Sequence, residues 1–251
     1  MKLTEETQYV RSVHLNKLEE NEFPFSLPAV QLLQEKLIFH PNVTYIVGEN
    51  GMGKSTLLEG IAAALGINPE GGTQNFTFSS YASHSNLHHL LKVTKGVHKP
   101  DDLFFFRAET YYNLATTIEE LDREGLGPRI IDSYGGRSLH EQSHGESFFA
   151  TFMYRFRGEG LYILDEPEAA LSPIRQLSML TRMHELVQGG SQLIISTHSP
   201  ILMSYPEAKI LQLKEKGMRE VNVEETDHYI TMKQFFDDKD RLMHHLLKDE
   251  R

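Results

Sequence analysis

A glycine-rich loop that ends in a lysine and two hydroxyl residues has the composition expected of a phosphate-binding site. It follows the phosphate-loop pattern of a glycine, four further residues and then Gly-Lys-Ser. Backbone N–H groups of such a loop, together with the positive end of the helix that follows, attract phosphate oxygens. We predict that this loop binds a nucleotide through Gly48, Glu49, Asn50, Gly51, Met52, Gly53, Lys54, Ser55 and Thr56.

Two residues of this loop have specific predicted roles. Lys54 would reach the β- and γ-phosphates, and the hydroxyl of Ser55 would bind Mg²⁺. The alternative is a chance glycine-rich turn, which leaves the flanking pattern unexplained. Residues 44–47 are a short run typical of a buried strand, and apolar residues at helical spacing follow the loop as far as Gly66.

Three further polar side chains stand at the ends of apolar runs. Asp165 and Glu166 come directly after four apolar residues, and His198 follows a second such run. Ligands of open α/β sheets gather at the carboxyl ends of strands, so we expect these side chains beside Lys54. We predict that Asp165 holds Mg²⁺, that Glu166 is the general base, and that His198 contacts the γ-phosphate. A lone histidine is more often structural, but its place at a strand end favours the functional interpretation.

The order of apolar runs along the chain predicts an α/β fold of the phosphate-loop type. Apolar strands alternate with helices, which favours a mostly parallel sheet flanked by helices. Further strands are predicted within residues 9–18 and at 103–106, and further helices at 29–37, 108–124, 147–157 and 173–187. We expect a single domain over residues 1–251, with a short helical insert at about 66–144 and a helical tail at about 229–251.

Three motifs together resemble those of the ATP-binding-cassette (ABC) class of ATPases: Gly48–Ser55, Leu164–Pro167 and Ser196–Pro200. The resemblance covers residues 43–213. It is closest to stand-alone ABC-type ATPases of the P-loop AAA family, akin to the Rad50 and SMC proteins, and not to a transporter subunit. It implies ATP and Mg²⁺ as cofactors, and a homodimer in which two ATP molecules are sandwiched head to tail.

In such a dimer each ATP contacts the phosphate loop of one subunit and a signature motif of the other. Residues 142–147 resemble that motif best, which implies that Ser143 and Gly145 bind the nucleotide of the opposite subunit. His144 departs from the pattern, because it stands where the family has its first glycine. The alternative is the Ser/Gly N-cap of an ordinary helix.

The resemblance also suggests residues for two further contacts. Gln74 is the candidate for the glutamine that joins the metal site in this family, and Tyr9, Phe23 or Phe25 could stack on adenine. For the three aromatic residues, a place in the hydrophobic core is the alternative. Histidines that lack a clear carboxylate partner are interpreted as solvated surface and not as a metal site: His84, His88, His89, His244 and His245.

The composition limits the class of function. A net charge of −10 argues against extensive non-specific nucleic-acid binding, without excluding a local basic patch. The absence of cysteine excludes disulfides and cysteine-bound metals. The sequence shows neither a signal peptide nor an apolar run long enough to span a membrane, so we expect a cytoplasmic protein.

Two classes of function fit these observations. The first is an ATPase whose ATP-gated dimerisation drives or signals to an unknown protein partner. The second is a nucleotide-dependent scaffold with little turnover; Glu166 favours the first, because a pure binder needs no base. A transporter-type nucleotide-binding subunit is a third interpretation with less support. The insert is too short for a long coiled coil, so DNA tethering by such an element is not expected.

Overall fold

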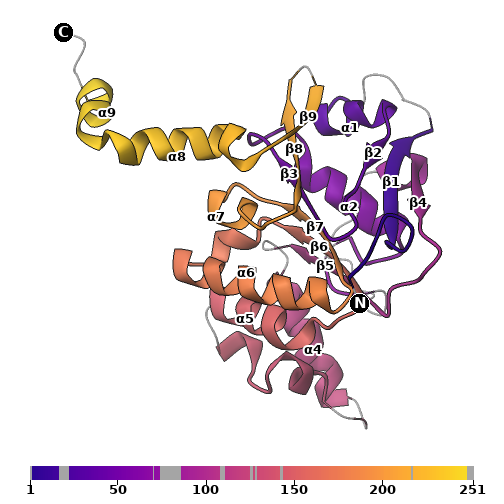
Figure 1. Cartoon of the computed structure of the whole chain (residues 1–251). Coiled ribbons are helices and arrows are strands. Elements are labelled where there is room, and N and C mark those ends of the chain that lie inside the picture. The colour runs from indigo at the N-terminus through magenta and orange to yellow at the C-terminus, as the bar shows by residue number, and fades with distance from the viewer. Residues whose placement is uncertain are drawn as a thin grey trace.

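A six-stranded sheet forms the centre of the computed structural model (Figure 1). Its strands lie in the order β5 (Asp102–Arg107), β6 (Gly160–Asp165), β7 (Gln192–Ser196), β3 (Val43–Val47), β8 (Lys209–Lys214) and β9 (Gly217–Val221). Neighbouring strands are parallel except β9, which pairs antiparallel with β8 as a hairpin. The structure describes residues 2–16, 23–69, 71–73, 86–107, 111–124, 127, 129–141, 144–215 and 217–247.

Successive residues of the parallel strands enter two different hydrophobic cores, one on each face of the sheet. On β5, Phe104 and Phe106 belong to one core and Phe105 to the other, and all three are buried. Strand β3 repeats the pattern with Tyr45 and Ile46. Side chains of a strand alternate between faces, so continuous apolar runs are required where both faces are covered.

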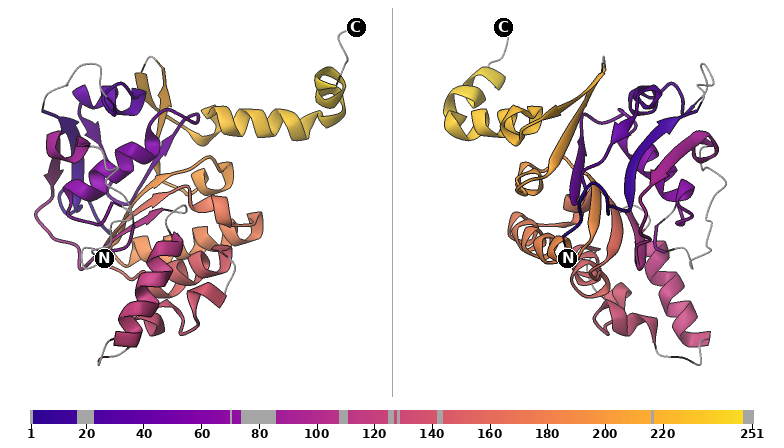
Figure 2. Two further views of the ribbon diagram at one scale, coloured as in Figure 1. Left: turned by 180° about the vertical axis from the view of Figure 1, so that it is seen from behind. Right: turned by 45° about the vertical axis from the view of Figure 1, so that its right-hand side comes forward.

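Different elements cover the two faces (Figure 2). The first core is completed by α4 (Tyr111–Glu124), α5 (His144–Ala150), the π-helical turn η5 (Thr151–Arg155), α6 (Pro173–Gln188) and α7 (Pro200–Met203). The second is completed by α1 (Pro28–Gln31), α2 (Lys54–Ala64), α3 (Leu87–Leu90) and an antiparallel sheet of β2 (Leu37–Ile38), β1 (Val10–Leu15) and β4 (Leu91–Lys95). The predicted α/β fold with a mostly parallel, helix-flanked sheet is confirmed.

One buried glutamine joins the small sheet to the central sheet. The side-chain oxygen of Gln192 accepts hydrogen bonds from the N–H groups of Tyr9 (3.1 Å) and Val10 (2.9 Å). Its side-chain nitrogen donates to the carbonyl oxygens of Val10 (2.8 Å) and His40 (3.1 Å). Buried amides are stable when their hydrogen bonds are satisfied, so Gln192 fixes β1 against the first residue of β7.

The helix expected at residues 29–37 is shorter in the structure. After α1 the chain makes a 3-10 turn, η1 (Leu32–Gln34), and then enters β2, where Leu37 pairs with Val13 of β1. The spacing of apolar residues predicted a helix as far as Leu37, but pairing with β1 makes Leu37 part of a strand and buries it in the second core. Within the predicted insert the described residues include β4 and β5 as well as α4 and the 3-10 turns η3 (Ile130–Tyr134) and η4 (Leu139–Glu141).

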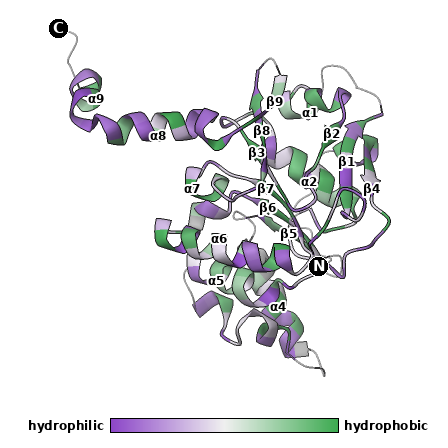
Figure 3. Ribbon diagram, viewed as in Figure 1, coloured by the Kyte–Doolittle hydropathy of each residue, from purple (hydrophilic) through white to green (hydrophobic). Residues whose placement is uncertain are grey.

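The C-terminal segment forms two helices that project from the body of the molecule (Figures 1 and 2). They are α8 (Asp227–Asp237) and α9 (Lys239–Leu246), and neither contains a buried residue. We call them the arm. Hydrophobic and hydrophilic residues alternate along it (Figure 3). In the part of the chain that the structure describes, a helix both long and apolar enough to cross a membrane is not found.

Candidate nucleotide-binding site

The phosphate loop leads from β3 into α2 through a glycine that no other residue replaces easily. Gly53 is the N-cap of α2 and has a φ of 86°, in the left-handed region. A Cβ at this position would lie 2.9 Å from Cβ of Leu27, which is closer than side chains approach. The N–H of Ala29 also donates to the carbonyl of Met52 at 2.9 Å. The segment around α1 therefore supports the loop from outside and requires a glycine at its end.

The side chain of Lys54 folds back onto the loop that precedes it. Its ammonium donates to the carbonyl oxygens of Gly48 (2.7 Å) and Glu49 (2.9 Å), and the residue is buried. Burial lowers the pKa of Lys54, while the nearby carboxylates of Glu166 and Asp165 act in the opposite direction. An ammonium has three donors, and these two bonds leave one for a phosphate oxygen.

Asp165 ends β6 next to the first turn of α2. It is 5% exposed, and its Oδ1 is buried without a hydrogen-bond partner among the described residues. Burial raises the pKa of Asp165 to about 6, and the hydroxyl of Ser55 and the guanidinium of Arg107 partly oppose this. An orphaned carboxylate oxygen beside a hydroxyl is a donor set that suits a hard cation such as Mg²⁺. The predicted pair of Ser55 and Asp165 thus fits a magnesium ion.

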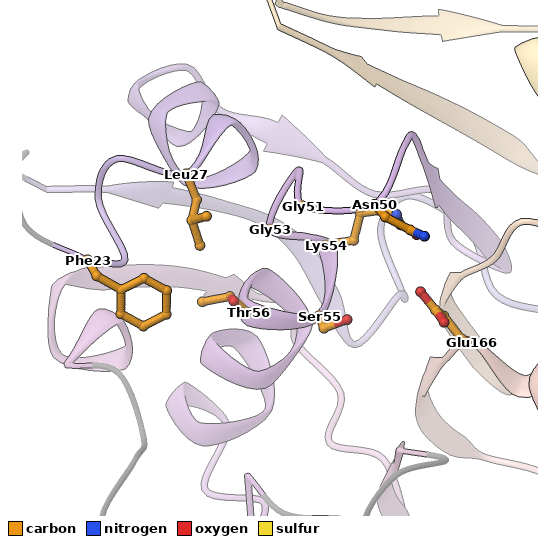
Figure 4. A pocket seen from close by; sticks show the side chains of 9 residues that line it. All are labelled: Phe23, Leu27, Asn50, Gly51, Gly53, Lys54, Ser55, Thr56 and Glu166. Atoms are coloured by element: carbon orange, nitrogen blue, oxygen red, sulfur yellow. The ribbon is translucent and has the colours of Figure 1, made fainter.

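Glu166 lies opposite the phosphate loop in an unusual backbone conformation. Its φ and ψ are 48° and 54°, which is the left-handed region, and its N–H donates to the carbonyl of Ser196 at 3.0 Å. Its carboxylate faces the loop from the end of β6 (Figure 4). One pocket is lined by both segments: Phe23, Leu27, Asn50, Gly51, Gly53, Lys54, Ser55, Thr56 and Glu166. Non-glycine residues held in this region are enriched at functional sites.

His198 approaches Glu166 from the end of β7. Its Nε2 lies 3.3 Å from Oε1 of Glu166, but the two atoms are not aligned as a hydrogen bond, and Nε2 has no other partner in the described structure. The backbone N–H of His198 donates to Oε1 of Glu168 at 2.5 Å. Burial raises the pKa of Glu168, and this hydrogen bond opposes the rise. Glu168 therefore holds the His198 segment, while Glu166 lines the pocket.

Sequence reasoning missed one residue of this cluster, His228, whose Nε2 lies 2.8 Å from Nδ1 of His198. His228 lies in the first turn of α8, one residue before the predicted start of the tail. Its neighbours in sequence form no recognisable motif. Only the three-dimensional structure brings it to the site.

Other predicted residues lie elsewhere. Gly145 is buried in the first turn of α5 and does not line the pocket, and Ser143 and Gln74 lie outside the described residues. Tyr9 and Phe25 are buried in the second core, whereas Phe23 lines the pocket with 69% of its surface exposed. Of the three aromatic candidates for adenine, Phe23 alone is placed at the pocket, and core packing is confirmed for the other two. The described residues contain no metal-binding cluster of histidine and acidic side chains.

Comparison with known proteins gives matches along most of the chain. Residues 19–122 match a family model described as "AAA domain", and residues 118–204 match one described as "AAA domain, putative AbiEii toxin, Type IV TA system". The chain is 24% identical over 191 residues to "ABC transporter G family member STR2" of Medicago truncatula, covering 68% of this chain and 26% of the relative. It is 28% identical over 170 residues to a "Putative ABC transporter ATP-binding protein" of Listeria monocytogenes, covering 62% of each.

The fold has a counterpart of nearly the same length among solved structures. CbiO1 from Clostridium perfringens, described as part of the ABC transporter complex cbiONQ, matches with a TM-score of 0.50 and 17% identity. The match covers 96% of this chain and 99% of that one. Similarity at this level establishes the fold, while activity and partners depend on the residues of the site. The two partial family matches, this fold, and the phosphate loop with its strand-end carboxylates show that the chain has a P-loop fold similar to that of ABC-type ATP-binding proteins.

Proposed function

We propose that the chain binds Mg·ATP in the pocket of Figure 4 and hydrolyses it. The observation that carries this proposal is the position of Glu166, a carboxylate that faces the phosphate loop across one pocket. A protein that only binds nucleotide does not need a base there, so the arrangement favours an enzyme over a scaffold.

The remaining side chains supply the other requirements of phosphoryl transfer. Lys54 neutralises charge on the β- and γ-phosphates with its third N–H. Ser55 and Asp165 would hold Mg²⁺, which stabilises negative charge on phosphate oxygens when bound. Glu166 accepts the proton of the attacking water, and Nε2 of His198 donates a hydrogen bond to the γ-phosphate. Phe23 offers the exposed aromatic face for the adenine base.

The proposal includes an ATP-gated homodimer. The described part of the signature-like segment, from His144 onward, forms the start of α5, which packs against α4 and the 3-10 turn η6 (Pro167–Ala170). Its Gly145 is not part of the pocket lining of its own chain. By the resemblance to ABC ATPases, Ser143 and Gly145 would contact ATP bound to a second copy. Formation of this ATP-bound dimer would drive or signal to a protein partner. Two of the similar proteins are named as parts of ABC transporters, so a membrane protein is a second candidate for the partner.

Glu166→Gln tests the enzymatic part of the proposal. The amide keeps the shape of the side chain but cannot accept a proton, so hydrolysis should fall by about 10²-fold or more. ATP affinity measured by calorimetry should stay within about threefold of wild type, since 1 kcal/mol of lost binding is roughly fivefold. Light scattering should then detect a dimer in Mg·ATP.

Asp240→Asn is the matched control, because Asp240 lies in the exposed arm and does not line the pocket. It should retain wild-type turnover. If purified wild-type protein binds Mg·ATP but releases no phosphate above background, alone or with co-purifying proteins, the enzyme assignment fails and the scaffold remains.

A further inference from the structure

Two histidines from distant parts of the chain share a hydrogen bond beside the nucleotide pocket. Nδ1 of His198, at the end of β7, lies 2.8 Å from Nε2 of His228, in the first turn of α8. The rings meet edge to face, with centroids 4.9 Å apart and planes inclined by 66°. The opposite ring nitrogen of His198 faces Glu166. A single imidazole thus connects the candidate base to the arm.

The position of His228 is fixed by its immediate neighbours. Thr226 is fully buried and caps α8 by accepting from the N–H of Tyr229 (3.3 Å). The carboxylate of Asp227 accepts from Nε2 of Gln212 (2.6 Å) and Nζ of Lys214 (3.1 Å), both on β8. The root of the arm is therefore held on the sheet, although the rest of the arm is not buried. His228 meets His198 from this anchored root and not from a free surface loop.

Hydrogen-bond chemistry decides which ring donates. In a neutral imidazole one nitrogen carries a proton and the other accepts, so two neutral rings bonded together have two possible arrangements. If His198 donated from Nδ1, its bare Nε2 would face the carboxylate of Glu166 at 3.3 Å, and two acceptors would repel each other. That arrangement would also leave a proton on Nδ1 of His228, which is buried without a partner among the described residues. A buried unpaired N–H is rarer than a buried unpaired acceptor.

The reverse arrangement avoids the repulsion at Glu166 and leaves an unpaired acceptor, not an unpaired N–H, on His228. His228 donates from Nε2, Nδ1 of His198 accepts, and the proton of His198 is on Nε2, where it points toward Glu166 and the phosphate loop. Burial, His198 and Lys54 all lower the pKa of His228, which favours a neutral ring, while Asp227 and Glu49 oppose them. The bond therefore selects one tautomer of His198.

We propose that His228 is a positioning residue of the nucleotide site, which donates a hydrogen bond to His198 and so keeps the His198 proton on the nitrogen that faces Glu166 and the γ-phosphate. Its importance for turnover rests on the function proposed above, but the tautomer itself does not. Without His228, His198 would populate both tautomers and rotate more freely, and part of the population would present a lone pair to the phosphate. Orienting the second ring nitrogen is a recurrent way of setting the role of a histidine.

Nitrogen NMR of histidine-labelled protein without nucleotide tests this assignment directly. The His198 signals are identified by their loss in His198→Gln. Wild-type protein should show the Nε2–H tautomer at His198. His228→Phe keeps an aromatic ring but removes the donor, and should give a mixture of both tautomers. His228→Gln places an amide N–H near the same position and should restore the wild-type pattern.

Rates of ATP hydrolysis give a second readout. His228→Phe should lower kcat by about tenfold, equivalent to ~1.4 kcal/mol in the barrier, with little change in KM for ATP. His228→Gln should recover most of this loss. His245→Phe, on the exposed face of α9, is the matched control and should behave as wild type.

Either of two results overturns the proposal: a His198 tautomer in His228→Phe that is identical to wild type, or a shifted tautomer with kcat unchanged. Absence of any hydrolysis in wild type would refute the enzyme assignment instead. The spectra of the nucleotide-free protein would still decide whether His228 positions His198.

Discussion

At the scale of single residues, the site combines ordinary side chains with one costly backbone conformation. Glu166 has a left-handed φ of 48°, which costs a non-glycine residue about 1–2 kcal/mol. The strand before it and the N–H bond to Ser196 keep it there and direct its carboxylate at the pocket. The position of this carboxylate is thus supported by the pairing of two strands and not by side-chain contacts alone.

A pair of substitutions at Glu166 measures this backbone cost. Glu166→Gly and Glu166→Ala both remove the carboxylate, but only glycine adopts a left-handed conformation freely. We expect the glycine variant to be more stable than the alanine variant by about 1 kcal/mol, the reverse of their order in a helix. Urea unfolding of both proteins measures the difference. An alanine variant as stable as the glycine variant would contradict the observed conformation.

The raised pKa of Asp165 predicts a pH dependence of stability in protein free of magnesium and nucleotide. Its pKa is about 6 in the folded protein against an ordinary value of 3.8, so the folded state favours the protonated form. The free energy of unfolding should therefore fall as the pH rises from 4 to 6, by at most about 3 kcal/mol from this residue. Above pH 6 the buried charge is present and its cost is complete.

Asp165→Asn removes this titration and isolates its contribution. Wild type should lose stability relative to Asp165→Asn between pH 4 and pH 6, as followed by urea unfolding in the presence of a chelator. Asp240→Asn, in the exposed arm, controls for the loss of one carboxylate elsewhere. Parallel stability curves for wild type and Asp165→Asn would refute burial of this charge.

Residues of the site differ in how far sequence could predict them. Lys54, Asp165 and His198 stand at fixed offsets from apolar strands, and strand ends of a parallel sheet meet at one edge. Their convergence could therefore be predicted from a local sequence pattern together with one rule about where the ends of parallel strands lie. The contact of His228 with His198 joins residues 30 positions apart through the packing of the root of the arm, and no local pattern encodes it.

At the scale of elements, the turn from β3 into α2 depends on two glycines in the left-handed region. Gly51 has a φ of 80° and Gly53 a φ of 86°. A Cβ would meet nothing within 4 Å at Gly51, whereas at Gly53 it would approach Leu27 to 2.9 Å. The two glycines share a left-handed backbone conformation, but only Gly51 has room for a side chain. They can therefore be compared as a matched pair.

Alanine at each position separates the two costs. Gly51→Ala should lose about 1 kcal/mol of stability from the backbone alone. Gly53→Ala should lose about 2 kcal/mol or more, because Leu27 and the start of α1 must also move. Thermal unfolding measures both, and equal losses would show that the contact with Leu27 is not restrictive. ATP affinity should fall more in Gly53→Ala, since this residue caps the helix that points at the phosphates.

Elements with strong periodicity were predicted, and those defined by pairing were not. The strand at β6 and the helix α6, with Ser172 as its N-cap accepting from the N–H of Arg175, follow from local signals. Strand β4 and the hairpin of β8 and β9 carry many polar residues and lack alternation clear enough to identify them. Their hydrogen bonds to β1 and β3 stabilise them, and such partners are not visible in local sequence.

At the scale of the whole molecule, the proposed mechanism requires a second copy of the chain. The pocket is lined by residues around the phosphate loop and by Glu166, whereas Gly145 lies in α5 on the other face of the sheet. Within one chain, the signature-like segment is therefore separate from the nucleotide that it is proposed to contact. A head-to-tail pair would bring the two segments together.

Ser143→Arg tests this pairing. Ser143 immediately precedes α5 in sequence, so a bulky cation in place of its small hydroxyl would be disfavoured by the helix dipole and would crowd the partner's nucleotide. We expect the monomer to bind ATP within about threefold of wild type, a change below 1 kcal/mol. Dimerisation in Mg·ATP, followed by light scattering in the Glu166→Gln background, should be lost. A Ser143→Arg protein that dimerises with ATP and hydrolyses it at the wild-type rate would refute the head-to-tail arrangement.

Mixing two defective proteins extends this test to the composite site. In a dimer of one Lys54→Ala subunit and one Ser143→Arg subunit, one site carries both defects and the other has an intact phosphate loop and an intact signature-like segment. Partial hydrolysis should return if the two sites act independently, because the intact site needs one contribution from each chain. Mixtures with Lys54→Ala/Ser143→Arg double-mutant subunits are the control, since every site in dimers with either parent is then defective. Recovery of activity in that control would contradict the shared site, and recovery in the first mixture alone would support it.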